Sequence, residues 1–145
     1  MAPLTDSRNT QEMAPSQERV GLLTSLQTIH AGAILMRNSV GHLAAGVALP
    51  GYYGVGRAEE TNVSGASGGV VKQRYREGIF RFANSAAADE ITIADIGAAC
   101  FIVDDQAVAK TDGTATRSPA GAVVDVDALG VWVRFDEALT RAILS

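Results

Sequence analysis

The sequence has little charge, few aromatic residues, one cysteine and two histidines. Charged residues make up 19% and aromatic residues 6% of its 145 residues. A single cysteine, Cys100, excludes an intrachain disulfide. The apolar run around it, "IGAACFIVDD", favours a buried structural thiol over a nucleophile. Neither His30 nor His42 has a partner at a spacing typical of a metal site, so we expect no bound metal from the histidines.

The chain also lacks an excess of basic residues and a long apolar run. Its formal net charge is −4 and its pI is about 5.1, which argues against a protein that neutralises nucleic-acid phosphates. No segment approaches the roughly 18 apolar residues of a membrane-spanning helix, and the N-terminus has no apolar core of a secretory signal. We therefore expect no nucleic-acid partner, no membrane partner and no export.

Motifs for phosphate binding and for covalent catalysis are missing as well. The stretch "GYYGVGR" is neither a dinucleotide-binding glycine motif nor a P-loop, and "GASGG" lacks the strand-to-helix setting of a nucleophile elbow. We expect no cofactor, no catalytic residue and a protein that is not an enzyme.

What the chain does contain is apolar residues and turn signals. Hydrophobic residues make up 47%, and 15 glycines punctuate short apolar runs, which is typical of an all-β domain. We predict a small sandwich or barrel-like domain over residues 29–145, with a short C-terminal helix in "DEALTRAILS". No internal repeat of fixed period is visible. The expected strands lie at 29–36, 68–82 with a bulge at Gly78, 90–93, 99–104, 106–110 and 121–135, the last with a hairpin turn at 127–130.

Residues 1–28 are expected to form an extended N-terminal arm. Residues 1–19 are polar, contain Pro3 and Pro15, and show neither helical nor strand periodicity. Such a segment cannot bury enough apolar surface to order itself. We expect it to become ordered by pairing with another protein, with Leu4 among its contacts.

Five aspartates crowd the stretch from residue 101 to residue 135, as they would in a metal site. The loop "DDQAVAKTDGTATR" supplies no bidentate glutamate of a calcium loop. Each aspartate stands instead at a strand end or turn, where its carboxylate can accept backbone N–H groups. We interpret them as turn residues and expect no metal. They are Asp104, Asp105, Asp112, Asp125 and Asp127.

Two sets of residues suit an interface with a partner. Lys72, Arg74 and Arg76 form a cationic row on one face of a strand, which is either a solvated sheet face or a salt-linked contact with an acidic partner. Tyr52, Tyr53 and Trp132 are amphipathic side chains of the kind that anchor interfaces, although Trp132 fits a core position equally well.

The segment "ITIADIGAACFIVDDQAVAKTDGTATRSPAGAVVDVDALGVWVRF" resembles a stretch of small structural proteins of tailed bacteriophages and prophages. These are capsid decoration, cement or head-stabilising proteins. The shared pattern is a turn at Asp95 and Gly97, a strand ending in "VDD", a "TDGT" loop and the run "AGAVVDVDALGVWV". The resemblance covers roughly the last third of the chain, and "AGAILMRNSVGHLAAG" resembles the opening strands of such proteins more loosely.

This resemblance implies a β-rich, non-enzymatic protomer that forms a homo-oligomer, often a trimer. Its partner would be the major capsid protein, on the outer surface of the capsid, after synthesis in the bacterial cytoplasm. Two alternatives remain open. One is a structural component of the tail or the head–tail connector. The other is a small β-barrel hydrolase or ligand-binding module, with Cys100, His42 and the aspartates as its site.

Overall fold

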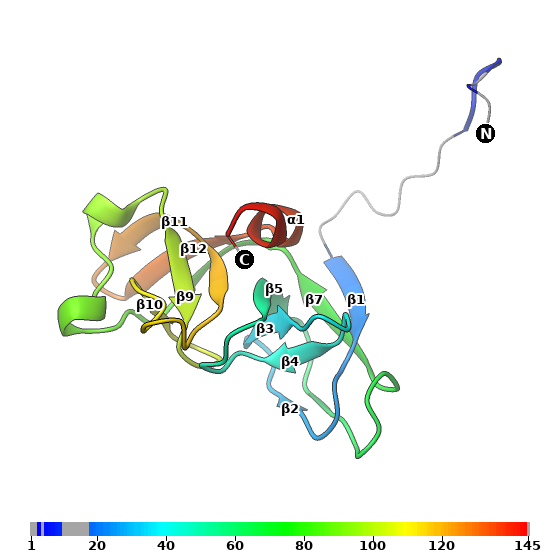
Figure 1. Cartoon of the computed structure of the whole chain (residues 1–145), viewed down its shortest axis with the longest axis horizontal. Coiled ribbons are helices and arrows are strands. Elements are labelled where there is room, and N and C mark those ends of the chain that lie inside the picture. The colour runs from blue at the N-terminus through cyan, green and yellow to red at the C-terminus, as the bar shows by residue number, and fades with distance from the viewer. Residues whose placement is uncertain (1–2, 4, 10–17, 145) are drawn as a thin grey trace.

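The computed structural model describes residue 3, residues 5–9 and residues 18–144, and these residues are folded mainly as β-strands. Two five-stranded sheets lie side by side and form the body, and a two-stranded ribbon of β2 (Thr28–Ile29) and β6 (Asn62–Val63) extends from one of them (Figure 1). The all-β prediction is confirmed. Leu4 and residues 10–17 of the expected arm lie outside the described residues.

The first sheet contains strands from the first half of the chain. Its spatial order is β1-β7-β5-β3-β4, and all of its neighbouring strands are antiparallel. Beyond β1, Leu23 forms a parallel bridge with Leu43 of β4, so the sheet curls into a partly closed barrel, called here the first barrel. Its strands are β1 (Glu18–Leu22), β3 (Ile34–Arg37), β4 (Leu43–Ala45), β5 (Tyr53–Ala58) and β7 (Lys72–Arg76).

The second sheet is built in the same way from the second half of the chain. Its order is β10-β9-β11-β12-β8, and a parallel bridge between Ala83 and Ala107 curls it into the second barrel. The hairpin turn expected at 127–130 is confirmed, because Asp127 pairs with Gly130. The strands are β8 (Gly78–Phe82), β9 (Ala99–Ile102), β10 (Val108–Ala109), β11 (Pro119–Asp127) and β12 (Gly130–Phe135).

The two barrels are a structural repeat. The two strand orders match when each strand of the first barrel is replaced by its counterpart in the second: β1 by β8, β3 by β9, β4 by β10, β5 by β11 and β7 by β12. The register agrees too. Leu35 pairs with Gly56 in the first barrel and Cys100 pairs with Gly121 in the second, and Cys100 follows Leu35 by the same number of residues as Gly121 follows Gly56. A register shift follows directly in both sheets. The expectation of no internal repeat is therefore wrong at the level of structure.

The predicted bulge at Gly78 is a crossing between the barrels. Strand β7 ends the first barrel at Arg76 and β8 begins the second barrel at Gly78, so residues 68–82 are not one bulged strand. The apolar side chains change parity here because the chain changes sheets. Gly78 has a φ of +150°, a conformation that side-chain-bearing residues rarely adopt.

The expected arm is too long at its C-terminal end. Strand β1 pairs along its whole length with β7, and Leu23 is fully buried in the first barrel. Two expected strands are also revised. The run 29–36 is divided between β2 and β3 by a turn at Gly32, whose φ is +93°. The predicted strand at 90–93 is wrong, because these residues are in no strand and Ile93–Asp95 is a short 3-10 turn.

Strand β3 joins the barrels into one body because it is buried on both faces. Leu35 points into the core of the first barrel, whereas Ile34 and Met36 pack into the core of the second. This explains why "AILM" reads as an unbroken apolar run. Next to it Gly54 approaches the backbone of Ala120 so closely that a Cβ atom at Gly54 would lie 2.2 Å from the Ala120 carbonyl oxygen.

The predicted C-terminal helix is present and short. Asp136 caps α1 (Glu137–Leu139) by accepting the N–H of Leu139 at 3.1 Å, and a π-helical turn, Thr140–Leu144, follows. Among the residues that the structure describes, no helix has the length and apolar character to cross a membrane.

Candidate functional site

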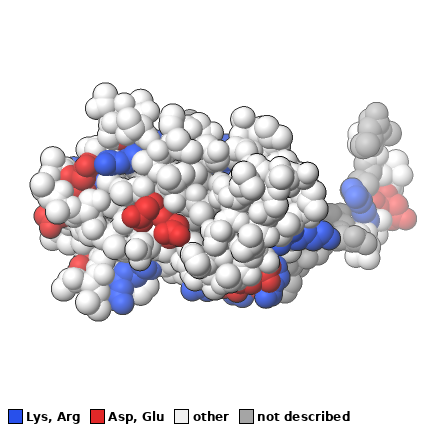
Figure 2. All heavy atoms as spheres, turned by 90° about the horizontal axis from the view of Figure 1, so that it is seen from below, with Lys and Arg blue, Asp and Glu red and all other residues white. Residues whose placement is uncertain are grey.

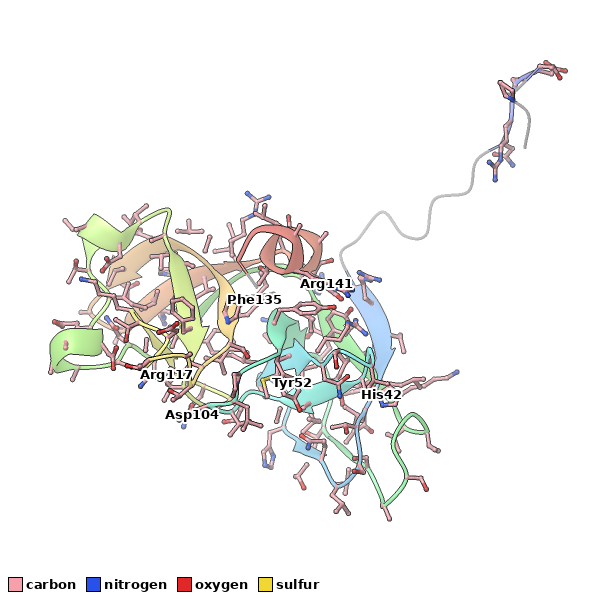
Figure 3. The ribbon with its side chains drawn as sticks, in the orientation of Figure 1. His42, Tyr52, Asp104, Arg117, Phe135 and Arg141 are labelled. Atoms are coloured by element: carbon pink, nitrogen blue, oxygen red, sulfur yellow. The ribbon has the colours of Figure 1, made fainter. Side chains whose placement is uncertain are left out.

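A hollow that contains Tyr52 and Tyr53 lies where the barrels and the C-terminal segment meet. This junction cleft has a volume of about 440 Å³, and three aromatic rings, two arginines and the carboxylate of Asp112 are among its walls. Figure 3 shows Tyr52 between the barrels, with Arg117 on the second barrel and Arg141 on the C-terminal segment. The wall side chains discussed below are Tyr52, Tyr53, Phe101, Arg117 and Arg141.

A buried serine fixes the floor of the junction cleft. Ser118, which is 1% exposed, accepts the N–H of Tyr52 at 2.9 Å and donates its hydroxyl proton to the carbonyl of Leu49 at 2.5 Å. These bonds connect the loop before β5 to the start of β11. The position of Tyr52 is therefore set by the contact between the two barrels.

Both arginines of the junction cleft are held by contacts within the chain. Arg117 donates to the Asp89 carboxylate at 3.2 Å and to the Thr111 carbonyl at 3.0 Å, while the Arg141 guanidinium lies 5.5 Å from the centre of the Tyr53 ring. The Thr111 hydroxyl and then Arg117 hold the pKa of Asp89 below its ordinary value. Aromatic rings beside anchored guanidiniums suit a partner that carries carboxylates or flat polar groups.

The cationic row is largely neutralised by glutamates of the same chain. Arg74 pairs with Glu18 and Glu60, each at 3.2 Å, and Arg76 pairs with Glu59 at 2.8 Å. The hydrogen bonds that Arg74 donates to Glu60 and Glu18 raise its pKa. Lys72 has no ion pair among the described residues. A contact of this row with an acidic partner would have to compete with these internal pairs. The face of the molecule drawn in Figure 2 carries small, separate groups of positive and negative side chains on a mostly uncharged surface.

Trp132 is partly buried on the outer face of the second barrel and lies outside the junction cleft. Its indole N–H donates to Asp127 at 2.9 Å, and the Arg81 guanidinium lies 5.2 Å from the centre of its ring. Tyr52 and Tyr53 are therefore brought together in one site, whereas Trp132 and the cationic row belong to other surfaces. Leu4 is outside the described residues.

Three of the aspartates act at turns, as expected. Asp104 accepts the N–H of Gln106, Asp112 that of Thr114, and Asp127 those of Leu129 and Gly130. Asp125 instead lies inside β11, beside a register shift, and accepts the N–H of Val126. In the described ranges no three His, Cys, Asp or Glu residues are grouped so that they could hold a metal ion.

Cys100 and His42 do not share a cleft. Cys100 is fully buried in the core of the second barrel, where burial raises the pKa of its thiol to about 12. His42 lies in the first barrel beside the loop at Gly68 and Gly69 (Figure 3). The arrangement that a cysteine–histidine hydrolase would need is therefore not formed.

Sequence reasoning missed Glu137, which anchors the C-terminal segment to the first barrel. Its carboxylate accepts hydrogen bonds from Arg37 Nε and from the Tyr75 hydroxyl, both at 2.7 Å, and from Arg19 at 3.5 Å. Burial and then the bond to Glu137 raise the pKa of Tyr75. The acidic pair "DE" after β12 signals a helix start, but nothing local to it indicates a bond to residues so distant in the chain.

The chain matches no family model, no curated protein and no solved structure.

Proposed function

We propose that this chain is a structural protein of a tailed-phage virion that binds the outer surface of the capsid and stabilises the head by bridging capsomers. Its partners are the major capsid protein and further copies of itself, with a trimer as the expected assembly. The proposal rests on the sequence resemblance together with one structural observation, which is the place where the N-terminal segment leaves the body.

That observation concerns β1. The strand pairs with β7 on one side and lies at the end of the strand order, and the polar N-terminal segment continues directly from it. Residues 5–9 are exposed and lie apart from the two barrels (Figure 1). A polar segment that leaves from a sheet edge can add a strand to another protein, which gains affinity from backbone hydrogen bonds.

The body suits the same task. Packaged DNA presses outward on a capsid, and a protein that spans neighbouring capsomers adds buried area at their joints without covalent chemistry. The segment that carries the resemblance forms β9 to β12, which is four of the five strands of the second barrel. The resembling residues thus form most of one structural unit.

A ligand-binding module is the second candidate, and the junction cleft favours it. Aromatic walls and two arginines are typical of a site that binds a small molecule with an anionic group. A panel of carboxylates and phosphates that shifts the thermal melt in proportion to concentration would support this function over the structural one.

The arm provides the test of the structural proposal. A chain that starts at Glu18 keeps β1 and the pairs of Glu18 with Arg74 and Arg76, so it should melt at the same temperature as the full chain. It should bind at least about tenfold more weakly to particles that lack the protein, because the lost contacts exist only in the bound state. Binding is measured by co-sedimentation.

The matched control is a full chain in which residues 1–17 are scrambled at constant composition. It should bind as weakly as the truncated chain. Equal binding by the full and truncated chains would refute the role of the arm, and failure of the full chain to bind particles would refute the proposed function itself.

A further inference from the structure

Strand β8 is an edge strand that remains open along most of its length. It stands at the end of the second sheet and pairs with β12 on one side. On its other side the barrel closes only beyond the strand, where Ala83 bonds to Gln106 and Val108. The backbone of β8 therefore presents one unpaired edge.

A hollow of about 440 Å³ runs along this edge. Four consecutive residues of β8, from Ile79 to Phe82, line it together with Gly32, Arg57 and Trp132. Successive side chains of a strand point to opposite faces of its sheet, and the hollow is lined by consecutive residues of β8 from both faces. Gly32 and Arg57 of the first barrel form its opposite wall.

The residues around this edge do not protect it against pairing. Natural edge strands carry prolines, lysines or inward-pointing charges that discourage an added strand. Strand β8 has the sequence GIFRF, without proline or lysine, and Ile79 is 50% exposed. Arg57 stacks on Phe80 at 4.2 Å and Arg81 on Trp132 at 5.2 Å, so two flat cation–aromatic pairs are already in place.

The charge of the lining indicates what the edge accepts. The charged residues of the lining are two arginines, and the carboxylates that bind them, those of Glu59 and Asp127, are not part of it. We propose that the free edge of β8 binds an extended segment of a partner protein as an added strand, in which acidic residues alternate with aliphatic ones. Backbone bonds to β8 supply the affinity, and the acidic side chains of the segment compete with Glu59 and Asp127 for Arg57 and Arg81, which gives the selection.

The test uses the full chain, labelled with ¹⁵N, and no capsid, so its outcome is independent of the proposed function. The probe is a capped peptide of about nine residues in which valine alternates with glutamate, long enough to cover the strand. The matched peptide has lysine in place of glutamate. We expect saturable binding of the acidic peptide with a Kd below about 1 mM. Amide exchange of residues 78–82 should slow at least about tenfold, with no change in β1.

Two charge reversals separate binding at this edge from general attraction. Arg81→Glu should weaken binding of the acidic peptide at least about tenfold. Arg134→Glu makes the same charge reversal in β12, outside the hollow, and should change the affinity for the acidic peptide by less than about twofold. Ile79→Asp, which places a negative charge on the exposed edge without touching an ion pair, should also weaken binding of the acidic peptide at least about tenfold.

The proposal is overturned by any of three results. These are no binding of the acidic peptide at millimolar concentration, equal binding of the basic peptide, and slowed exchange outside β8. A thermal melt of each variant shows that it is folded, and Ile79→Asp decides the matter if Arg81→Glu does not fold.

Discussion

Asp127 connects the turn of the β11–β12 hairpin with side chains of β12 and β8. Its carboxylate accepts the turn amides and the indole N–H of Trp132, and it pairs with Arg81. A side chain that a sequence scan could assign to a metal site thus orders a turn and positions the single tryptophan. Cys100 is comparable, since its reactive group is used for packing.

The charge of Asp127 should be visible in the fluorescence of Trp132. The indole hydrogen bond and then the Leu129 amide hold the pKa of Asp127 below its ordinary value of 3.8. The anion therefore stabilises the hairpin at pH values above about 4, and this contribution is lost as the pH falls through the lowered pKa. We expect a fluorescence transition of the folded protein below pH 4.

The control for this titration is Asp127→Asn, which keeps an acceptor for the turn amides and removes the charge. The transition should be absent in this variant. The assignment to Asp127 fails if the variant shows the same transition as the natural chain.

At the scale of elements, Glu137 anchors the C-terminal segment to the first barrel. Glu137 and Arg37 are only 12% and 15% exposed, and Tyr75 shares their hydrogen bonds. Glu137→Gln leaves the Arg37 charge without its partner in a poorly solvated place. We expect the free energy of unfolding to fall by about 2–3 kcal/mol in urea denaturation.

Glu90→Gln makes the same chemical change at an exposed position and should alter the free energy of unfolding by less than about 0.5 kcal/mol. Equal effects of the two substitutions would show that Glu137 does not anchor the segment.

The sequence predicted those elements whose boundaries are set by local chemistry. Asn38 and Gly41 end β3 as expected, since the Asn38 side chain accepts the N–H groups of Val40 and His42 and Gly41 has a φ of +96°. The hairpin turn, the capped helix and the buried thiol follow from similar local signals. Tyr52 and Tyr53 were found by residue type alone.

What depends on long-range contacts was not predicted. A local bulge and a change of sheet would each change the parity of the apolar side chains near Gly78, and the sequence does not distinguish the two. The repeat is not visible in the sequence, because its two copies share strand register, as at Gly56 and Gly121, while different side chains fill the two barrels. The contact of Glu137 with Arg37 joins residues that are 100 positions apart in the chain.

At the scale of the whole molecule, the two barrels act as one body because their backbones touch. At the point where Gly54 meets Ala120, a Cβ would require a backbone shift. Gly54→Ala should therefore lower the free energy of unfolding by about 1–3 kcal/mol. Gly65→Ala is the control, because nothing lies within 4 Å of a Cβ there, and it should be neutral or slightly stabilising. If both changes are neutral, the barrels are not in tight contact at this position.

The central claim is that this chain is bound to the outside of a phage head. Cryo-electron microscopy of phage particles, made with the gene for this chain intact and with the gene deleted, tests this proposal most directly. We predict density for the two-barrel body on the outer surface of the shell, absent after deletion and restored when the purified full chain is added. Heads that are identical with and without the gene, or density confined to the tail or the connector, would contradict the proposal.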